Sequence, residues 1–141
     1  RGTITGMTLG TTKAHIIRAC IESIAYNTYS IINTMSNKTI PIKELHVDGG
    51  GSKNQFLLQF QSNILQRNII KSKVSESTAM GAIYMVGINK KIFTLKQIEN
   101  NYKQEKIYTP ALTLSERNKL YKGWEIAIKT TKYNGRIKNE K

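Results

Sequence analysis

The residues from Val47 to Asn54 are the part of the sequence best suited to bind a ligand. They read Val-Asp-Gly-Gly-Gly-Ser-Lys-Asn and lie between a short apolar run and a helical pattern. Glycines at such a turn let the backbone approach a ligand, and the next helix begins with free N–H groups. The pattern matches neither the Walker sequence nor the dinucleotide-binding G-x-G-x-x-G sequence. On these residues alone, a nucleotide site and a tight glycine turn without a ligand are equally good interpretations.

The other reactive side chains form no second constellation. Asp48 is the only aspartate, and at a turn we expect it to order the backbone rather than to act as a base. His15 and Glu22 lie near Arg18 on a predicted helix, which favours surface pairing over catalysis. Cys20 and the two histidines do not have the spacing of zinc ligands, so we expect no metal held by these residues.

A long helix is predicted ahead of the glycine turn. Between residues 12 and 37, apolar side chains recur at steps of three and four, which draws one stripe along an α-helix. The residues of this stripe are Ile17, Ile21, Ile24, Ile31 and Met35, with Thr28 between them, and Ala14, Ala25 and Ile32 widen it. We expect the stripe to pack on a sheet or on other helices, and Pro41 to prevent the helix from continuing.

The glycine turn is predicted to join a strand to a helix. Residues 44–47 and 68–71 have the pattern of short strands, and the helical pattern of residues 56–65 lies between them. A β-α-β unit of this kind favours parallel strands joined by a right-handed crossover. Two strands cannot cover the predicted helices, so we expect further strands upstream of Arg1 and interpret the chain as a piece of a larger domain.

Beyond this unit the pattern is mainly helical. Helices are predicted over residues 78–88, 95–101 and 114–132, with a linker at 108–110. The polar, basic tail from Tyr133 is expected to be frayed.

Composition indicates a globular rather than a disordered chain. The sequence has 141 residues, 39% of them hydrophobic, and a net charge of +13. It contains no long apolar run and no signal-peptide pattern, so we expect a soluble, cytoplasmic protein without a membrane partner. The charge is mostly lysine, scattered from Lys13 to Lys141, whereas a nucleic-acid groove concentrates Arg and Lys with aromatic residues. Specific nucleic-acid binding is therefore not expected. A basic, non-enzymatic nucleic-acid-binding module is kept as the alternative because of the net charge alone.

Several blocks, in the same order along the chain, resemble the FGGY family of carbohydrate kinases. The blocks are GTITGM at 2–7, HI at 15–16, RA at 18–19, ESIAY at 22–26, VDGG at 47–50 with Asn54, QFQSNIL at 59–65, TAMGA at 78–82 and YKGW at 121–124. The later blocks resemble the glycerol kinases, one branch of that family, while xylulose and gluconate kinases of the same family are the alternatives. Cys20 departs from the family pattern, where a small or aliphatic residue is usual.

The resemblance implies a fold, an activity and a site. It implies the second domain, in part, of an actin-like, ribonuclease H-like ATPase fold with a helical C-terminal extension. The reaction would be ATP-dependent phosphorylation of glycerol, with Mg²⁺ carried by ATP. Gly50 and Asn54 would contact the adenosine end of ATP, with Gly49 and Gly51 permitting its approach. The catalytic base and the glycerol pocket would lie upstream of Arg1, so no catalytic residue is assigned within the chain and the chain alone is expected to be inactive.

The resemblance also implies a division of the chain and a state of assembly. Residues 1–90 would form the nucleotide-binding half of a partial kinase C-terminal domain. Residues 91–132 would be a helical segment of the same domain, and residues 133–141 a flexible basic tail. The intact protein would be a homo-oligomer.

Overall fold

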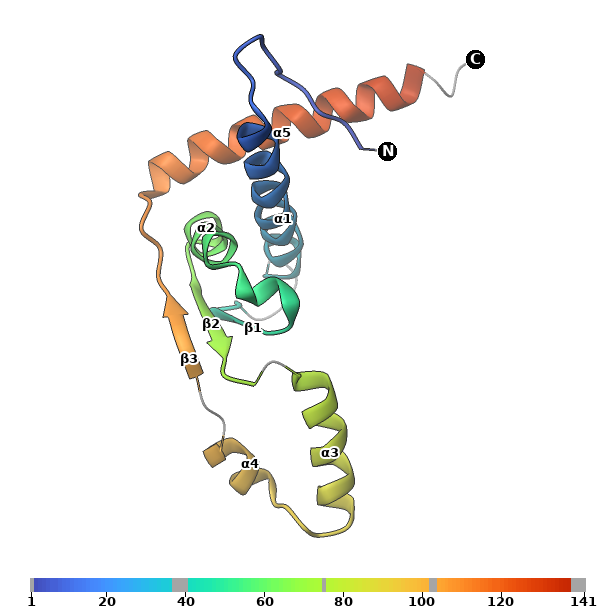
Figure 1. Ribbon diagram of the computed structural model, residues 1–141, viewed down its shortest axis with the longest axis vertical. Helices are drawn as coiled ribbons and strands as arrows, with labels where there is room; N and C mark the ends of the chain where they lie inside the picture. The colour runs from blue at the N-terminus through green and yellow to red at the C-terminus, as the bar shows by residue number, and fades with distance from the viewer. Residues whose placement is uncertain (1, 37–40, 75, 102–103, 138–141) are drawn as a thin grey trace.

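Helices and strands alternate along the chain (Figure 1). The computed structural model describes residues 2–36, 41–74, 76–101 and 104–137. The elements are α1 (Lys13–Ser36), β1 (Glu44–Val47), the 3₁₀ helix η1 (Gly50–Lys53), α2 (Gln55–Leu65), β2 (Asn68–Ser72), α3 (Ser77–Asn89), α4 (Leu95–Asn101), β3 (Gln104–Tyr108) and α5 (Leu114–Ile137). No helix of this described part is both long and apolar enough to span a membrane.

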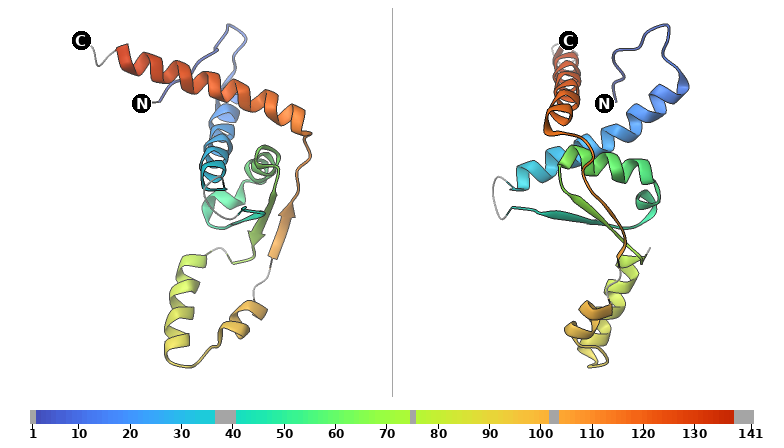
Figure 2. Two further views of the ribbon diagram at one scale, coloured as in Figure 1. Left: turned by 180° about the vertical axis from the view of Figure 1, so that it is seen from behind. Right: turned by 90° about the vertical axis from the view of Figure 1, so that its left-hand side faces the viewer.

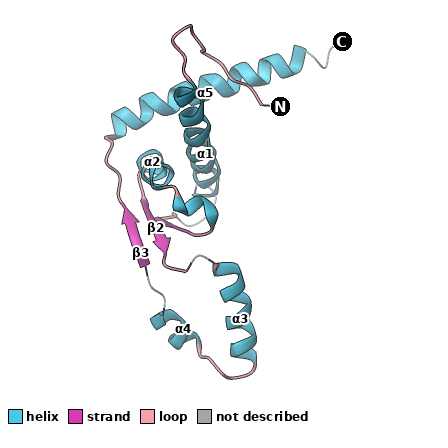
Figure 3. Ribbon diagram, viewed as in Figure 1, coloured by secondary structure: helices cyan, strands magenta, loops and turns pink. Residues whose placement is uncertain are grey.

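The three strands form one sheet in the order β1-β2-β3. Figure 3 shows β2 and β3 side by side. β1 and β2 are parallel, with Leu45 opposite Ile69, as predicted for the β-α-β unit. β3 pairs with β2 in the antiparallel direction and places Tyr108 opposite Ile69. The sequence analysis did not predict β3. It also placed the start of the linker at residue 108, whereas Tyr108 is the last residue of this strand.

Helices α1 and α2 lie on one face of the sheet (Figure 2). Buried side chains form two groups, one between α1 and α2 beneath α5 and the other between these two helices and the sheet. Their members are Ala25, Tyr26, Leu57, Phe60 and Ile64 in one group, and Ile32, Leu58, Leu65, Ile69 and Tyr108 in the other. Helix α2 is therefore the central element, since one side of it faces the sheet and another faces α1. This packing fixes the position of its N-terminus, where the glycine turn ends.

The buried face of α1 is one side of the stripe that the sequence indicated. Ile24 and Ile31 of that stripe are 49% and 60% exposed, whereas Ala25 and Ile32, one residue further along, are buried. Each step along an α-helix turns the side chain by about 100°. The helix and its packing on other helices are confirmed, but only the side of the stripe that holds Ile21, Ala25 and Ile32 is covered by described residues.

Helix α5 crosses the end of α1 and packs on it through aromatic rings (Figure 1). Trp124 stacks on Tyr26 at a centroid distance of 5.3 Å. Tyr121 meets Tyr29 edge to face at 4.6 Å, and its hydroxyl is 3.0 Å from Ser30 Oγ. The helix begins at Leu114 as predicted but extends to Ile137. Residues 133–137 are thus helical where a frayed tail was expected, and residues 138–141 of that tail lie outside the described residues.

Candidate nucleotide-binding site

A glycine turn joins β1 to α2. Gly49 has a φ of 75°, a conformation that suits glycine because it has no Cβ. The chain then forms η1, and Ser52 holds the turn closed: its backbone N–H donates to the Gly49 carbonyl at 3.2 Å, and its Oγ donates to the same carbonyl at 2.7 Å. The Ser52 side chain is buried, so its hydroxyl bonds within the turn rather than with solvent. The bend is therefore fixed by its own hydrogen bonds before any ligand binds.

Asn54 is the N-cap of α2. Its backbone is extended, and its Oδ1 accepts a hydrogen bond from the Leu57 N–H at 3.1 Å. This bond satisfies one of the free donors at the start of the helix. The side chain is exposed, and its amide nitrogen donates no hydrogen bond to any residue that the structure describes. Asn54 can thus keep its capping bond while offering two N–H donors to a ligand.

The outer surface of the turn is open. A Cβ placed on Gly49, Gly50 or Gly51 would have no heavy atom within 4 Å, apart from the residues adjoining it in the chain. No described side chain therefore fills the space in front of these glycines, and a flat ligand can approach the backbone there. The positive φ of Gly49 also disfavours any other residue at that position.

A hollow of about 230 Å³ lies beside the turn, at the carboxyl ends of the two parallel strands. Asp48 follows β1, Ser72 ends β2 and Ser77 begins α3, and all three line the hollow together with His46 and Val47. Ligands of open α/β sheets bind at the carboxyl ends of parallel strands. The hollow thus offers one carboxylate and two hydroxyl groups next to the open glycines.

The structure brings the four predicted site residues, Gly49, Gly50, Gly51 and Asn54, into one turn. It assigns the ordering of that turn to Ser52, which the sequence interpretation overlooked. The Asp48 carboxylate is exposed and makes no hydrogen bond within the described residues, so the expectation that it orders the turn is wrong.

The sequence interpretation also missed Ser72 and Ser77 as lining residues. A usable signal was available, because the carboxyl end of the second parallel strand must lie beside that of the first.

The ionisable groups with shifted pKa values lie away from this hollow. Burial raises the pKa of Tyr26 to about 12, and its ring lies in the aromatic cluster under α5. Hydrogen bonds from the Thr113 hydroxyl and N–H lower the pKa of Glu116 at the start of α5. Arg18 pairs with Glu22 at 2.7 Å, one helical turn apart, which confirms the predicted surface pairing.

The described residues hold no group of three His, Cys, Asp or Glu side chains that could bind a metal ion. Asp48 is the one carboxylate among the residues that line the hollow.

A comparison with known protein families identifies the family of this chain. Residues 1–89 match the C-terminal domain of the FGGY family of carbohydrate kinases. The chain belongs to this family. The matched residues include the glycine turn, α2 and α3.

Within the family, the chain is similar to glycerol kinases. It is 43% identical to that of Borreliella afzelii over 136 residues, which cover 94% of this chain and 27% of the relative. It is 45% identical to that of Thermococcus gammatolerans over 130 residues, with 92% and 26% covered. The chain thus spans about a quarter of the length of these relatives.

Solved structures agree on the fold. The Plasmodium falciparum glycerol kinase with ADP superposes with a TM-score of 0.83 at 29% identity, over 92% of this chain and 26% of that one. A ligand-bound xylulose kinase from Lactobacillus acidophilus gives 0.69 at 26% identity, over 87% and 25%. These likenesses confirm the predicted fold class, an α/β part of an actin-like, ribonuclease H-like ATPase fold.

Proposed function

We propose that this chain supplies the adenosine-binding part of a glycerol kinase, which transfers the terminal phosphoryl group of ATP to glycerol and gives sn-glycerol 3-phosphate. The observation that carries the proposal is the identity of 42–45% to glycerol kinases across nearly the whole chain. A solved relative that superposes over 92% of the chain is a glycerol kinase with ADP, which supports the nucleotide part of the proposal.

In this proposal the adenosine end of ATP lies against the open glycine turn. The backbone of Gly50 contacts the nucleoside, and Gly49 and Gly51 leave room for it because none of them carries a Cβ. The free amide of Asn54 donates hydrogen bonds to the purine edge. Mg²⁺ arrives bound to the phosphates of ATP, as in other phosphoryl transfers.

The remaining chemistry belongs to polypeptide outside this chain. Phosphoryl transfer needs a carboxylate near the attacking hydroxyl and cationic groups around the transferring phosphoryl. The residues that line the hollow provide Asp48 and His46, whose Nε2 is 2.9 Å from Glu44 Oε1, and they include no lysine or arginine to stabilise a transferring phosphoryl group. The base and the glycerol pocket are therefore expected upstream, and the isolated chain is expected to bind nucleotide weakly without turnover.

Two assays test the proposal. The full-length protein is given ATP with glycerol, xylulose or gluconate, and ADP release is measured. Turnover with glycerol alone supports the proposal, and preferential turnover with xylulose or gluconate contradicts the substrate assignment. The isolated chain is assayed under the same conditions, and brisk turnover by it would contradict the placement of the base upstream.

A matched pair of variants tests the site. Gly50→Val places a branched side chain where the nucleoside would lie, whereas Lys53→Ala alters the same turn without filling that space. We expect ADP affinity to fall for Gly50→Val and to stay near wild type for Lys53→Ala. Equal affinity in both variants would place the nucleotide elsewhere. A cytoplasmic location and a homo-oligomeric state stay predictions, which fractionation and light scattering of the full-length protein can check.

A further inference from the structure

Helix α3 is apolar on more than one side, yet almost none of it is buried. Its sequence is STAMGAIYMVGIN, and Gly87 is the one residue of the helix that is buried in the structure described. Met85 and Val86 are 71% and 61% exposed. A helix that is apolar all round is normally enclosed by other parts of a protein. The helix projects away from the sheet, at the opposite end of the molecule from α5 (Figure 1).

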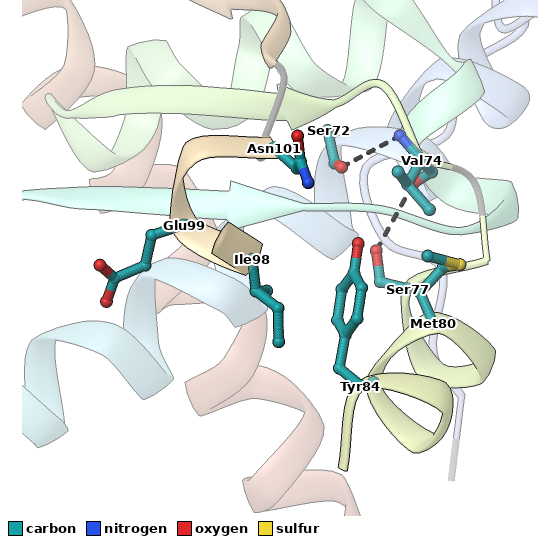
Figure 4. A pocket seen from close by; sticks show the side chains of 9 residues that line it. Ser72, Val74, Ser77, Met80, Tyr84, Ile98, Glu99 and Asn101 are labelled. Atoms are coloured by element: carbon teal, nitrogen blue, oxygen red, sulfur yellow. Dashed lines mark hydrogen bonds between the residues drawn. The ribbon is translucent and has the colours of Figure 1, made fainter. Parts of the chain in front are cut away.

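A second apolar surface of α3 faces α4 across a pocket of about 370 Å³ (Figure 4). Met80 and Tyr84, one helical turn apart, line this pocket with Ile98 of α4 and with Val74. Met85 and Val86 are not among the lining residues. Each step along the helix turns a side chain by about 100°, so Val86 lies opposite Tyr84 and Met85 lies between the two sides. Met80 and Tyr84 are thus half-buried at the pocket, while Met85 and Val86 are exposed away from it, so no single side of α3 holds its apolar side chains.

Gly81, which lines the same pocket, gives a further sign of a close neighbour. A glycine inside a helix weakens it relative to alanine, so its presence usually has a packing reason. A Cβ on Gly81 would have no heavy atom within 4 Å, apart from the helix backbone and the residues adjoining it in the chain. By contrast, a Cβ on Gly87 would clash with the Phe93 ring at 2.2 Å, which explains that glycine within the chain. The described residues give no such reason for Gly81.

We propose that α3 is an internal helix of the full-length protein, enclosed on both sides by polypeptide that precedes this chain. The chain spans about a quarter of the length of its relatives, and the family model that it matches is that of the C-terminal domain, so most of the remaining length is expected on the N-terminal side. A second copy related by two-fold symmetry would cover one side of the helix. Only a surrounding segment covers both the pocket side and the Met85 side and also approaches Gly81 closely.

The first test measures oxidation of Met85 in the full-length protein. Hydrogen peroxide oxidises an exposed methionine to the sulfoxide, and peptide mass spectrometry follows each methionine separately. The proposal predicts that Met85 reacts about tenfold or more slowly in the folded protein than in the same protein unfolded in guanidinium, because reaction then requires local opening. Comparable rates in the two states would overturn the proposal. Protection that disappears when an oligomer dissociates on dilution would also overturn it, since the cover would then be a second copy.

The second test uses the sign of a change in thermal stability. In an exposed helix, Gly81→Ala should raise the Tm of the full-length protein because alanine is the better helix former. If another segment lies against Gly81, the added methyl group lowers the Tm instead. Thr130→Ala on the exposed side of α5 serves as the propensity control and should raise the Tm slightly. A Tm that rises or stays unchanged in Gly81→Ala would overturn the proposal, and neither test depends on nucleotide binding.

Discussion

Two substitutions at Asn54 separate its structural bond from its proposed contact with nucleotide. The Oδ1 atom accepts from the Leu57 N–H at 3.1 Å, while the amide nitrogen is free to bind a ligand. Asn54→Asp retains an acceptor for the capping bond and removes both donors. Asn54→Ala removes the acceptor and the donors together. The pair therefore tests each half of the side chain on its own.

The expected magnitudes follow from these bonds. Loss of an N-cap side chain costs about 1 kcal/mol, so Asn54→Ala should lower the free energy of unfolding by that amount. Asn54→Asp should leave stability unchanged or raise it by a few tenths of a kcal/mol, because a carboxylate suits the positive end of the α2 dipole. One lost hydrogen bond of about 1 kcal/mol corresponds to roughly fivefold in affinity, so both variants should bind ADP at least that much more weakly.

Stability is measured by urea unfolding of the chain followed by circular dichroism, and ADP affinity by calorimetry on the full-length protein. The decisive variant is Asn54→Asp, because its fold should be intact. If it binds ADP as tightly as wild type, the amide does not contact the nucleotide. If Asn54→Ala is as stable as wild type, the capping bond contributes nothing to the fold, and the structural half of the argument fails.

Three further predictions concern the fold. Leu58 is 2% exposed between α2 and the sheet, and Leu58→Ala should cost about 3 kcal/mol of unfolding free energy in denaturant titrations, whereas a cost below 1 kcal/mol would contradict its burial in a packed core. Because the pKa of Tyr26 is raised to about 12, its stabilising effect is complete below its ordinary pKa of 10.0 and is lost as the pH rises towards 12. Tyr26→Phe should therefore lose less stability than wild type over this interval, by up to about 2 kcal/mol, and identical alkaline unfolding curves would refute the shift. Glu116 has a lowered pKa, so its stabilising contribution is complete above its ordinary pKa of 4.5 and is lost as the pH falls through its pKa in the folded protein. Carboxyl NMR titration should show that Thr113→Ala moves the pKa of Glu116 back upward, because the substitution removes the hydroxyl hydrogen bond.

The glycine turn was predictable because its chemistry is local. Three glycines between an apolar run and a helical pattern require a bend, and a short polar side chain four residues after Gly50 suits a helix cap. The structure places the bend at Gly49, and it shows that Asn54, which the sequence analysis named only as a ligand contact, also caps α2. The bond that closes the turn was less predictable, because Asp48 and Ser52 are both suited to it and their relative positions depend on the path of η1.

Strand β3 could not be read from the sequence because its partner lies far away. Gln104, Glu105 and Lys106 form a polar run with no alternation, and only Tyr108 at the end of the strand is buried. Such a run is typical of an edge strand, which gains its hydrogen bonds from a neighbour rather than from burial. Here the neighbour is β2, more than thirty residues earlier in the chain. Long-range pairing of this kind leaves little local signal.

The exposed part of the stripe on α1 has a physical explanation that bears on the whole domain. Hydrophobic periodicity identifies side chains that avoid water, but it does not identify the partner that covers them. In the structure, α2 and α5 cover one apolar face of α1, and the stripe through Ile24 and Ile31 stays exposed on a neighbouring face. Helix α1 lies on the β1 side of α2, and the described part of β1 pairs only with β2, so its outer edge is free (Figure 1). Further strands added to that edge would lie beneath the exposed stripe. The exposed part of the stripe and the unpaired edge of β1 therefore support the same expectation, that the sheet continues past β1 in the full-length protein.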